Sequence, residues 1–213
     1  MRLILHVGVH RTATNATQSF LHRNQDRLLR RGIILGNRAK RHFITIKRIF
    51  DGHRAEVFEN MKRQMAETDA DTLILTDEDT VMNPDFTELR AFADYFDEVQ
   101  IVIALRRQDL WLESWYLQNI KWQWNPRFAH ATLEEFLAAR DEFFWAHYGQ
   151  LLDSLTFTFG QVVTPFVFER DQMEGGPIAT FCRAIGIDDI EGWAPAGTRN
   201  QSLSPPDRDW ETK

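Results

Sequence analysis

Short apolar runs alternate with longer amphipathic stretches along this chain. Four runs are almost entirely apolar and span residues 3–9, 72–76, 99–105 and 162–168. They show little alternation of apolar and polar residues, which is typical of strands buried on both faces of a parallel sheet. A shorter apolar run at residues 33–35 predicts one additional strand.

The stretches between these runs have the period of helices. Apolar residues recur at helical spacing over residues 17–30, 55–65, 86–96, 110–124 and 133–155, with a break near Asn125 and Pro126. Strands that alternate with helices predict an α/β fold of three layers, with a central parallel sheet flanked by helices. Ligands of such folds bind beyond the carboxyl ends of the strands, so the residues that follow each strand are the candidates for chemistry.

Composition bounds the domain count and the class of partner. A chain of 213 residues with 43% hydrophobic and 26% charged residues fits one globular domain, which we place at residues 1–204, followed by a polar tail at residues 205–213. The formal net charge of −6 gives no reason to expect a nucleic-acid partner.

Basic residues nevertheless gather in the first third of the chain. They are Arg23, Arg27, Arg30, Arg31, Arg38, Lys40, Arg41, Lys47 and Arg48. A solvated helix face is one interpretation of this cluster, and an anionic substrate that approaches from this side is the other.

Single residues and run lengths limit the remaining classes. Cys182 is the only cysteine, so the chain has no intrachain disulfide and no cysteine-based zinc site, and the apolar neighbours of Cys182 indicate a helical core position. No apolar run reaches the roughly 18–20 residues of a membrane span, and we expect a cytoplasmic protein. We found no set of His, Asp or Glu with metal-ligand spacing, so no metal is expected.

The segment after the first strand has the pattern of a phosphate-binding loop. A strand, a turn that contains Arg11, Thr12, Ala13, Thr14 and Asn15, and a helix follow one another. Free backbone N–H groups and the helix dipole attract phosphate at such a helix start, and Arg11 adds a permanent charge. Nucleoside triphosphatases have Gly and Lys where this chain has Ala13 and Thr14. The alternative is a Thr-rich helix cap without a ligand.

A second candidate follows the run at residues 99–105. Arg106 stands at the carboxyl end of that strand, and Ser114 lies eight residues later on the next helix, within reach of the same face. The alternative is that Arg106 and Arg107 are surface charges near Asp109 and Glu113.

Residues 3–21 resemble the 5′-phosphosulfate loop of bacterial sulfotransferases that use 3′-phosphoadenosine 5′-phosphosulfate (PAPS). The shared residues are His6, Gly8, Thr12, Thr14, Ala16, Gln18, Phe20 and Leu21. The departures are His10 for Pro, Arg11 for Lys, Ala13 for Gly and Asn15 for Thr. The spacing of Arg106, Ser114 and Tyr116 and the order of the segments at residues 162–168, 181–187 and 200–204 are also similar to the family.

The resemblance implies a P-loop-like fold and a sulfotransferase with PAPS as co-substrate. It implies that Arg11 takes the place of the loop lysine at the leaving phosphate and that residues 12–15 hold the 5′-phosphosulfate. It also implies that Arg106 and Ser114 bind the 3′-phosphate of the nucleotide.

Sulfuryl transfer needs a base for the acceptor, and three positions qualify. Asp77, Glu78 and Asp79 follow the strand at residues 72–76, where the family carries a glutamate, so Glu78 is the first candidate. A helix-cap cluster is the alternative for all three acids. His42 is the second candidate base and His10 the third.

The acceptor is expected to be a small molecule or a carbohydrate with a hydroxyl or an amine. Aromatic residues are frequent between residues 111 and 148, and Trp122 and Trp124 are candidates for stacking on it, although core packing or a homodimer interface would also use such residues. Two other functions stay open: an inactive nucleotide-binding interaction module, which the departures at Arg11 and Ala13 would favour, and a small-molecule kinase of the P-loop type.

Overall fold

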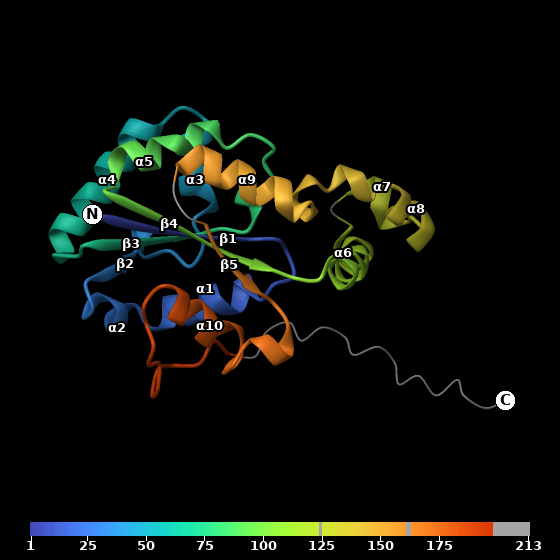
Figure 1. Cartoon of the computed structure of the whole chain (residues 1–213). Helices are drawn as coiled ribbons and strands as arrows, with labels where there is room; N and C mark the ends of the chain where they lie inside the picture. The colour runs from blue at the N-terminus through green and yellow to red at the C-terminus, as the bar shows by residue number, and fades with distance from the viewer. Residues whose placement is uncertain (124, 161–162, 198–213) are drawn as a thin grey trace.

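Five parallel strands form the centre of the molecule in the computed structural model, which describes residues 1–123, 125–160 and 163–197. The strand order is β2-β3-β1-β4-β5 (Figure 1). The strands are β1 Arg2–Gly8, β2 Ile33–Leu35, β3 Thr72–Thr76, β4 Glu98–Leu105 and β5 Val163–Val167. The predicted α/β class and the parallel sheet are therefore confirmed.

Helices cover both faces of this sheet, as Figure 1 shows. One face carries α1 Thr14–Arg23, α2 Gln25–Leu29 and α10 Gly176–Ala184, and the other carries α3 Phe43–Phe50, α4 Arg54–Thr68, α5 Ala91–Tyr95 and α9 Tyr148–Phe159.

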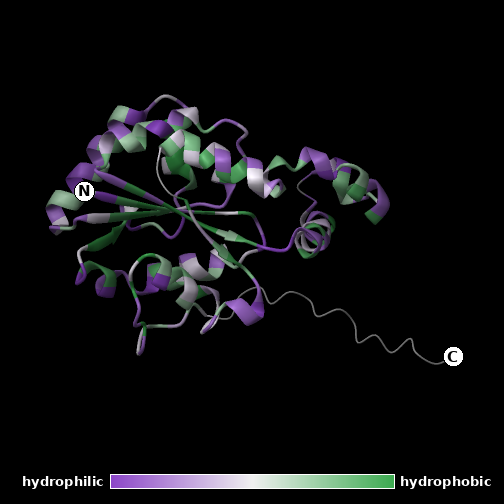
Figure 2. Cartoon of the chain, viewed as in Figure 1, coloured by the Kyte–Doolittle hydropathy of each residue, from purple (hydrophilic) through white to green (hydrophobic). Residues whose placement is uncertain are grey.

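Burial on both faces explains why β1, β3 and β4 are nearly continuous apolar runs, whereas the edge strand β5 was wrongly expected to be buried on both faces, since Pro165 and Val167 are exposed. Leu3 and Leu5 of β1 belong to one hydrophobic cluster, and Ile4 between them belongs to the other. Successive side chains of a strand point to opposite faces, so a strand covered on both sides needs apolar residues at nearly every position. Figure 2 shows the inner strands mostly in the colour of hydrophobic residues. Cys182 is fully buried in the cluster beneath α10, which confirms its predicted core position.

Three further helices form an arm beyond the carboxyl ends of the strands (Figure 1). They are α6 Gln108–Trp122, α7 Pro126–Ala129 and α8 Leu133–Ala138. Since α6 starts directly after β4, the arm stands beside the edge of the sheet where ligands of this fold class bind.

The prediction of one helix over residues 133–155 was wrong. The chain leaves α8 after Ala138, makes 3₁₀ turns at Arg140–Glu142 and Phe144–Ala146, and becomes helical again in α9. Phe143, with φ −90° and ψ 68°, ends the first of these 3₁₀ turns. Both Phe143 and Trp145 are buried against Trp111, so tertiary packing outweighs the local helical pattern.

Other boundaries also differ from prediction. Residues 17–30 form two helices, which are separated at the buried Asn24; this residue has φ −109° and ψ 21°, and its side chain bonds to the backbone of Ala194. Residues 86–96 form a 3₁₀ turn at Thr87–Arg90 followed by the short α5, and α3 was not predicted.

The basic cluster of the first third has several internal partners. Arg27 donates to the carbonyl of Gly192, Arg23 donates to that of Pro195, and Arg41 pairs with acidic residues described below. Much of this cluster therefore holds the fold together. Within the described ranges, no helix combines the length and the apolar composition that a bilayer crossing requires.

Some predictions concern residues outside the described ranges. These are the strand start at Val162, the stacking candidate Trp124, the segment at residues 200–204 and the tail at residues 205–213.

Candidate functional site

The loop between β1 and α1 has an unusual backbone. Arg11 has φ 70° and Ala13 has φ 59°, so two residues other than glycine occupy the left-handed region. Each costs about 1 kcal/mol or more relative to an ordinary conformation. Gly8 leaves little room for a side chain, because a Cβ there would lie 3.1 Å from the Thr14 hydroxyl and 3.2 Å from that of Thr12. Such strain is characteristic of functional loops.

This loop presents backbone donors rather than a capped helix end. Ala13 precedes α1 and cannot cap it, and the Thr12 hydroxyl donates to the carbonyl oxygen of Val9 at 2.7 Å. Within the described ranges, the N–H groups of residues 13–15 donate to no protein oxygen. Free N–H groups at the start of a helix suit a phosphate group, and the expected side-chain cap is not formed.

Arg11 does not lie alongside its own loop but crosses to α6. Its Nε donates to Ser114 Oγ at 2.7 Å, and its Nη1 donates to Gln118 Oε1 at 3.1 Å. Arg106 approaches from the end of β4, with its Nη1 3.3 Å from the carbonyl oxygen of Arg11. The structure thus brings Arg11 close to Arg106 and Ser114, which lie 95 and 103 positions later in the sequence.

These two arginines influence each other. Burial, and next the positive charge of Arg106, lower the pKa of Arg11. Two guanidinium groups in a half-buried position repel each other, and an anion between them would offset that repulsion. Arg107, in contrast, points outward and pairs with Asp109, as the surface-charge interpretation proposed for it.

His10 connects this loop with the acidic residues after β3. Its Nε2 lies 3.1 Å from Asp79 Oδ1, and its ring lies 4.8 Å from that of Trp115. The indole N–H of Trp111 donates to the His10 carbonyl at 2.8 Å. These two buried tryptophans of α6 therefore hold His10, and with it the loop, in place.

Arg41 organises the three acids at the end of β3. Its Nε lies 2.7 Å from Asp77 Oδ1, its Nη2 lies 2.6 Å from Asp79 Oδ2, and its Nη1 lies 3.8 Å from Glu78 Oε1. The hydroxyl of Thr80 donates to Asp77 at 3.1 Å. None of the three carboxylates accepts a backbone N–H within the described part of the chain, so their partners are side chains and not a helix start.

The pKa values of the three acids move in different directions. Burial raises the pKa of Asp77 and of Glu78 despite the nearby Arg41. Burial alone would also raise the pKa of Asp79, but the hydrogen bond with His10 and the charge of Arg41 lower it. Glu78, which has the longest contact to Arg41, is the acid best suited to accept a proton.

His42 holds the backbone instead of facing a ligand. Its Nδ1 accepts the N–H of Thr76 at 2.9 Å, and its Nε2 lies 2.7 Å from the carbonyl oxygen of Gly36. Its side chain is 1% exposed, and burial lowers its pKa. Because both ring nitrogens are engaged, the geometry favours a structural role over the predicted role as a base.

Three residues near the site were not singled out as site residues from the sequence. Lys40 Nζ donates to Asn15 Oδ1 at 3.0 Å, Gln118 contacts Arg11, and Arg41 holds the acids. Lys40 and Arg41 belonged to the basic cluster of the first third of the chain. Of its two interpretations, only that of an approaching anionic substrate implied a position near the site. Gln118 lies one helical turn after Ser114, which is the one signal that could have identified it.

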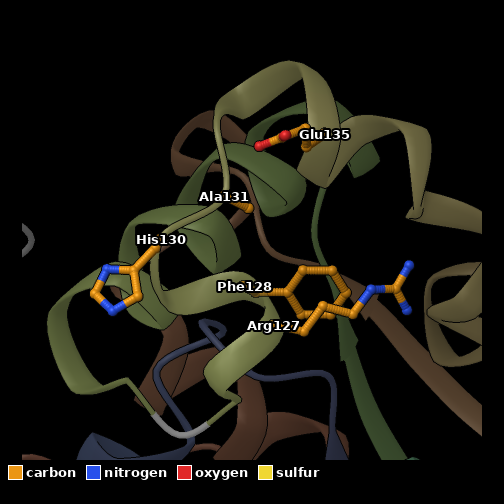
Figure 3. Close-up of a pocket in the computed structure, with 5 residues that line it drawn as sticks. All are labelled: Arg127, Phe128, His130, Ala131 and Glu135. Carbon is orange, nitrogen blue, oxygen red and sulfur yellow. The ribbon is translucent and has the colours of Figure 1, made fainter.

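A hollow on the arm lies apart from these residues. It measures about 380 Å³ and is lined by Arg127, Phe128, His130, Ala131 and Glu135 (Figure 3). Arg127 donates to Glu142 at 2.6 Å, Glu135 accepts the N–H of Thr132, and Figure 3 shows Arg127 and His130 pointing apart. These side chains do not converge on one ligand.

Comparison with known proteins gives a fold relationship. No protein-family model matches the sequence, and no curated protein matches it. A crystal structure of a sulfotransferase from Alicyclobacillus acidocaldarius superposes with a TM-score of 0.56 at 15% sequence identity, over 93% of this chain and 85% of that one. This five-stranded parallel α/β domain therefore has the fold of a bacterial sulfotransferase.

Proposed function

We propose that this chain binds PAPS and transfers its sulfuryl group to a hydroxyl or amine of a small molecule or carbohydrate. One observation carries the proposal: the free N–H groups of the β1–α1 loop and the pair Arg106 and Ser114 lie at the same edge of the sheet, joined by Arg11. A nucleotide with phosphates at both its 5′ and 3′ positions needs two anion sites of this kind.

The residues present fit such a nucleotide. The N–H groups of residues 13–15 and the hydroxyl of Thr14 would hold the 5′-phosphosulfate, and the Thr12 hydroxyl would hold the loop in shape through its bond to Val9. Arg106 has no carboxylate within ion-pair distance in the described ranges, so its charge is available for the 3′-phosphate, with the Ser114 hydroxyl beside it. PAPS would supply the sulfuryl group, and the protein would supply orientation and charge.

Glu78 is the proposed base. Only 13% of its side chain is exposed, and burial raises its pKa, which makes it a stronger proton acceptor than an ordinary surface carboxylate. Arg41 and Asp79 connect it through His10 to the phosphate loop. Glu78 would accept the proton of the acceptor hydroxyl or amine.

Calorimetric titration with adenosine 3′,5′-bisphosphate, the nucleotide product, tests this proposal. We expect binding that is much tighter than that of 5′-AMP or of ATP with magnesium, because only the bisphosphate fills both anion sites. Equal affinity for 5′-AMP and the bisphosphate would contradict the proposal. A preference for ATP with magnesium would instead indicate a kinase, which Ala13 and Thr14 disfavour because they replace the Gly and Lys of that loop.

A nucleotide-binding module without turnover is the second candidate. It is favoured by the left-handed Ala13, where glycine would be unstrained, and by an Arg11 side chain that contacts α6. Tight binding of the bisphosphate together with no transfer from PAPS to a broad panel of alcohols, sugars and amines would support this module.

A further inference from the structure

We infer that Arg11 and Gln118 are ligands of the 3′-phosphate, so that the loop cation of this chain selects 3′-phosphorylated nucleotides rather than contacting the leaving phosphate. This inference rests on the proposed function and changes the role that the sequence suggested for Arg11. The geometry of four side chains supports it.

The backbone directs Arg11 away from the 5′ end of the site. With φ 70°, the residue lies in the left-handed region, and its side chain reaches α6 while the N–H groups of the next residues remain at the start of α1. A strained backbone at a half-buried arginine needs a compensating role.

The contacts on α6 mark a single face of that helix. Ser114 and Gln118 are four residues apart and therefore lie one above the other. Arg11 donates its Nε to the first at 2.7 Å and its Nη1 to the second at 3.1 Å. The hydroxyl and the amide can also donate to an anion, so the face offers more than a resting place for the guanidinium.

Arg106 completes the set from the end of β4. Its Nη1 lies 3.3 Å from the carbonyl oxygen of Arg11, close enough for its charge to act on the Arg11 side chain. The guanidinium forks of Arg11 and Arg106, with the hydroxyl and the amide that Arg11 contacts, would match the three oxygens and the double negative charge of a phosphate monoester. The loop then offers the 5′ group its backbone N–H groups, and the ammonium group of Lys40 lies beside Asn15 at the start of α1.

The experiment compares adenosine 3′,5′-bisphosphate with 5′-AMP by calorimetry on the wild type, Arg11→Gln and Gln118→Ala. The two nucleotides differ only in the 3′-phosphate. We expect Arg11→Gln to weaken the bisphosphate about tenfold to hundredfold and 5′-AMP less than about twofold. Gln118→Ala should weaken the bisphosphate about threefold, again without affecting 5′-AMP. Arg107→Gln, which removes a neighbouring exposed charge, is the matched control and should change neither affinity.

The outcomes separate this inference from the proposed function. If Arg11→Gln weakens both nucleotides by the same factor, or neither, the inference is overturned while the bisphosphate preference of the wild type still supports the proposed function. If the wild type shows no bisphosphate preference, both are overturned. Should Arg11→Gln not fold, Gln118→Ala decides: loss confined to the bisphosphate supports the inference, and unchanged affinity overturns it.

Discussion

The two charged clusters at the carboxyl edge of the sheet differ in how their charges are compensated. After β3, Arg41 stands among three carboxylates and binds two of them at hydrogen-bond distance. Between β1 and β4, Arg11 and Arg106 bring two positive charges together, and the contacts of Arg11 on α6 are with the neutral Ser114 and Gln118.

On the proposed function, the cationic cluster is the one that binds a charged ligand. A cation between carboxylates is an internal network that stabilises the fold. The charges of Arg11 and Arg106 repel each other, and an anion bound between them would offset that repulsion. In the acidic cluster, the proposed base Glu78 has the longest contact with Arg41, at 3.8 Å.

Removing Arg106 should have the largest effect on the cationic cluster. Arg106→Ala takes away a guanidinium that faces the proposed 3′-phosphate, and we expect the affinity for adenosine 3′,5′-bisphosphate to fall about a hundredfold. Calorimetry measures the loss, and thermal denaturation should show a folded variant. The neighbouring Arg107→Ala serves as the control, and a loss of similar size there would mean that general charge, not position, governs binding.

Removing Arg41 should destabilise the acidic cluster. Arg41→Gln leaves three neighbouring carboxylates without their shared cation, and we expect the free energy of unfolding to fall by about 2 kcal/mol. This is less than for a fully buried pair, because the Arg41 side chain is 36% exposed. Urea denaturation measures the change. Arg48→Gln breaks the exposed pair with Glu56 and should have little effect, so equal losses in both variants would contradict the comparison.

The sheet was predictable because its strands are buried on both faces. The apolar runs that became β1, β3 and β4 need no tertiary information, since each position is covered whichever face it points to. The positions of Arg106 and Ser114 in the fold were predictable for a related reason: the first directly follows a strand, and the second lies at a fixed distance along the next helix.

The contacts of the site required the folded chain. Arg41 meets Asp77 across 36 positions, and Arg11 meets Gln118 across 107. The periodicity of apolar and polar residues within one helix or strand cannot predict contacts over such distances in the sequence. The break between α8 and α9 was missed for the same reason, because Phe143 and Trp145 leave the helix to pack on Trp111. His42 illustrates the converse: its residue type indicated a base, and only the fold shows both nitrogens bound to the backbone.

The pH dependence of the stability of a Glu78→Gln variant should show whether Glu78 differs from Asp77 and Asp79 in its role. Its pKa is raised in the folded protein by burial, so the ionised side chain destabilises the fold at neutral pH, and this cost disappears as pH falls toward about 4.5. We expect Glu78→Gln to be more stable than the wild type at pH 7.5 and to lose that advantage on acidification. The effect should be smaller than that of Arg41→Gln.

The comparison between variant and wild type is needed because other groups titrate in the same range. Burial lowers the pKa of His6 to about 3 and also lowers that of His42, so both histidines reduce stability as pH falls below about 6.5. Their contribution is common to both proteins and cancels. Thermal denaturation between pH 4.5 and 7.5 gives the difference, and a Glu78→Gln variant less stable than the wild type at pH 7.5 would show that the carboxylate is a structural partner.

The smallest expected effect concerns the backbone of the phosphate loop. Ala13 has φ 59° and ψ 17°, a conformation that glycine adopts without strain. Ala13→Gly should therefore stabilise the fold by about 0.5–1 kcal/mol, since relief of strain exceeds the entropy that glycine adds to the unfolded chain. Ala16→Gly, three residues later inside α1, should destabilise by about the same amount because its conformation is helical. Opposite signs in urea denaturation would locate the strain in the loop itself; if both substitutions destabilise, Ala13 is held by its surroundings, and the second candidate function loses one of its two supports.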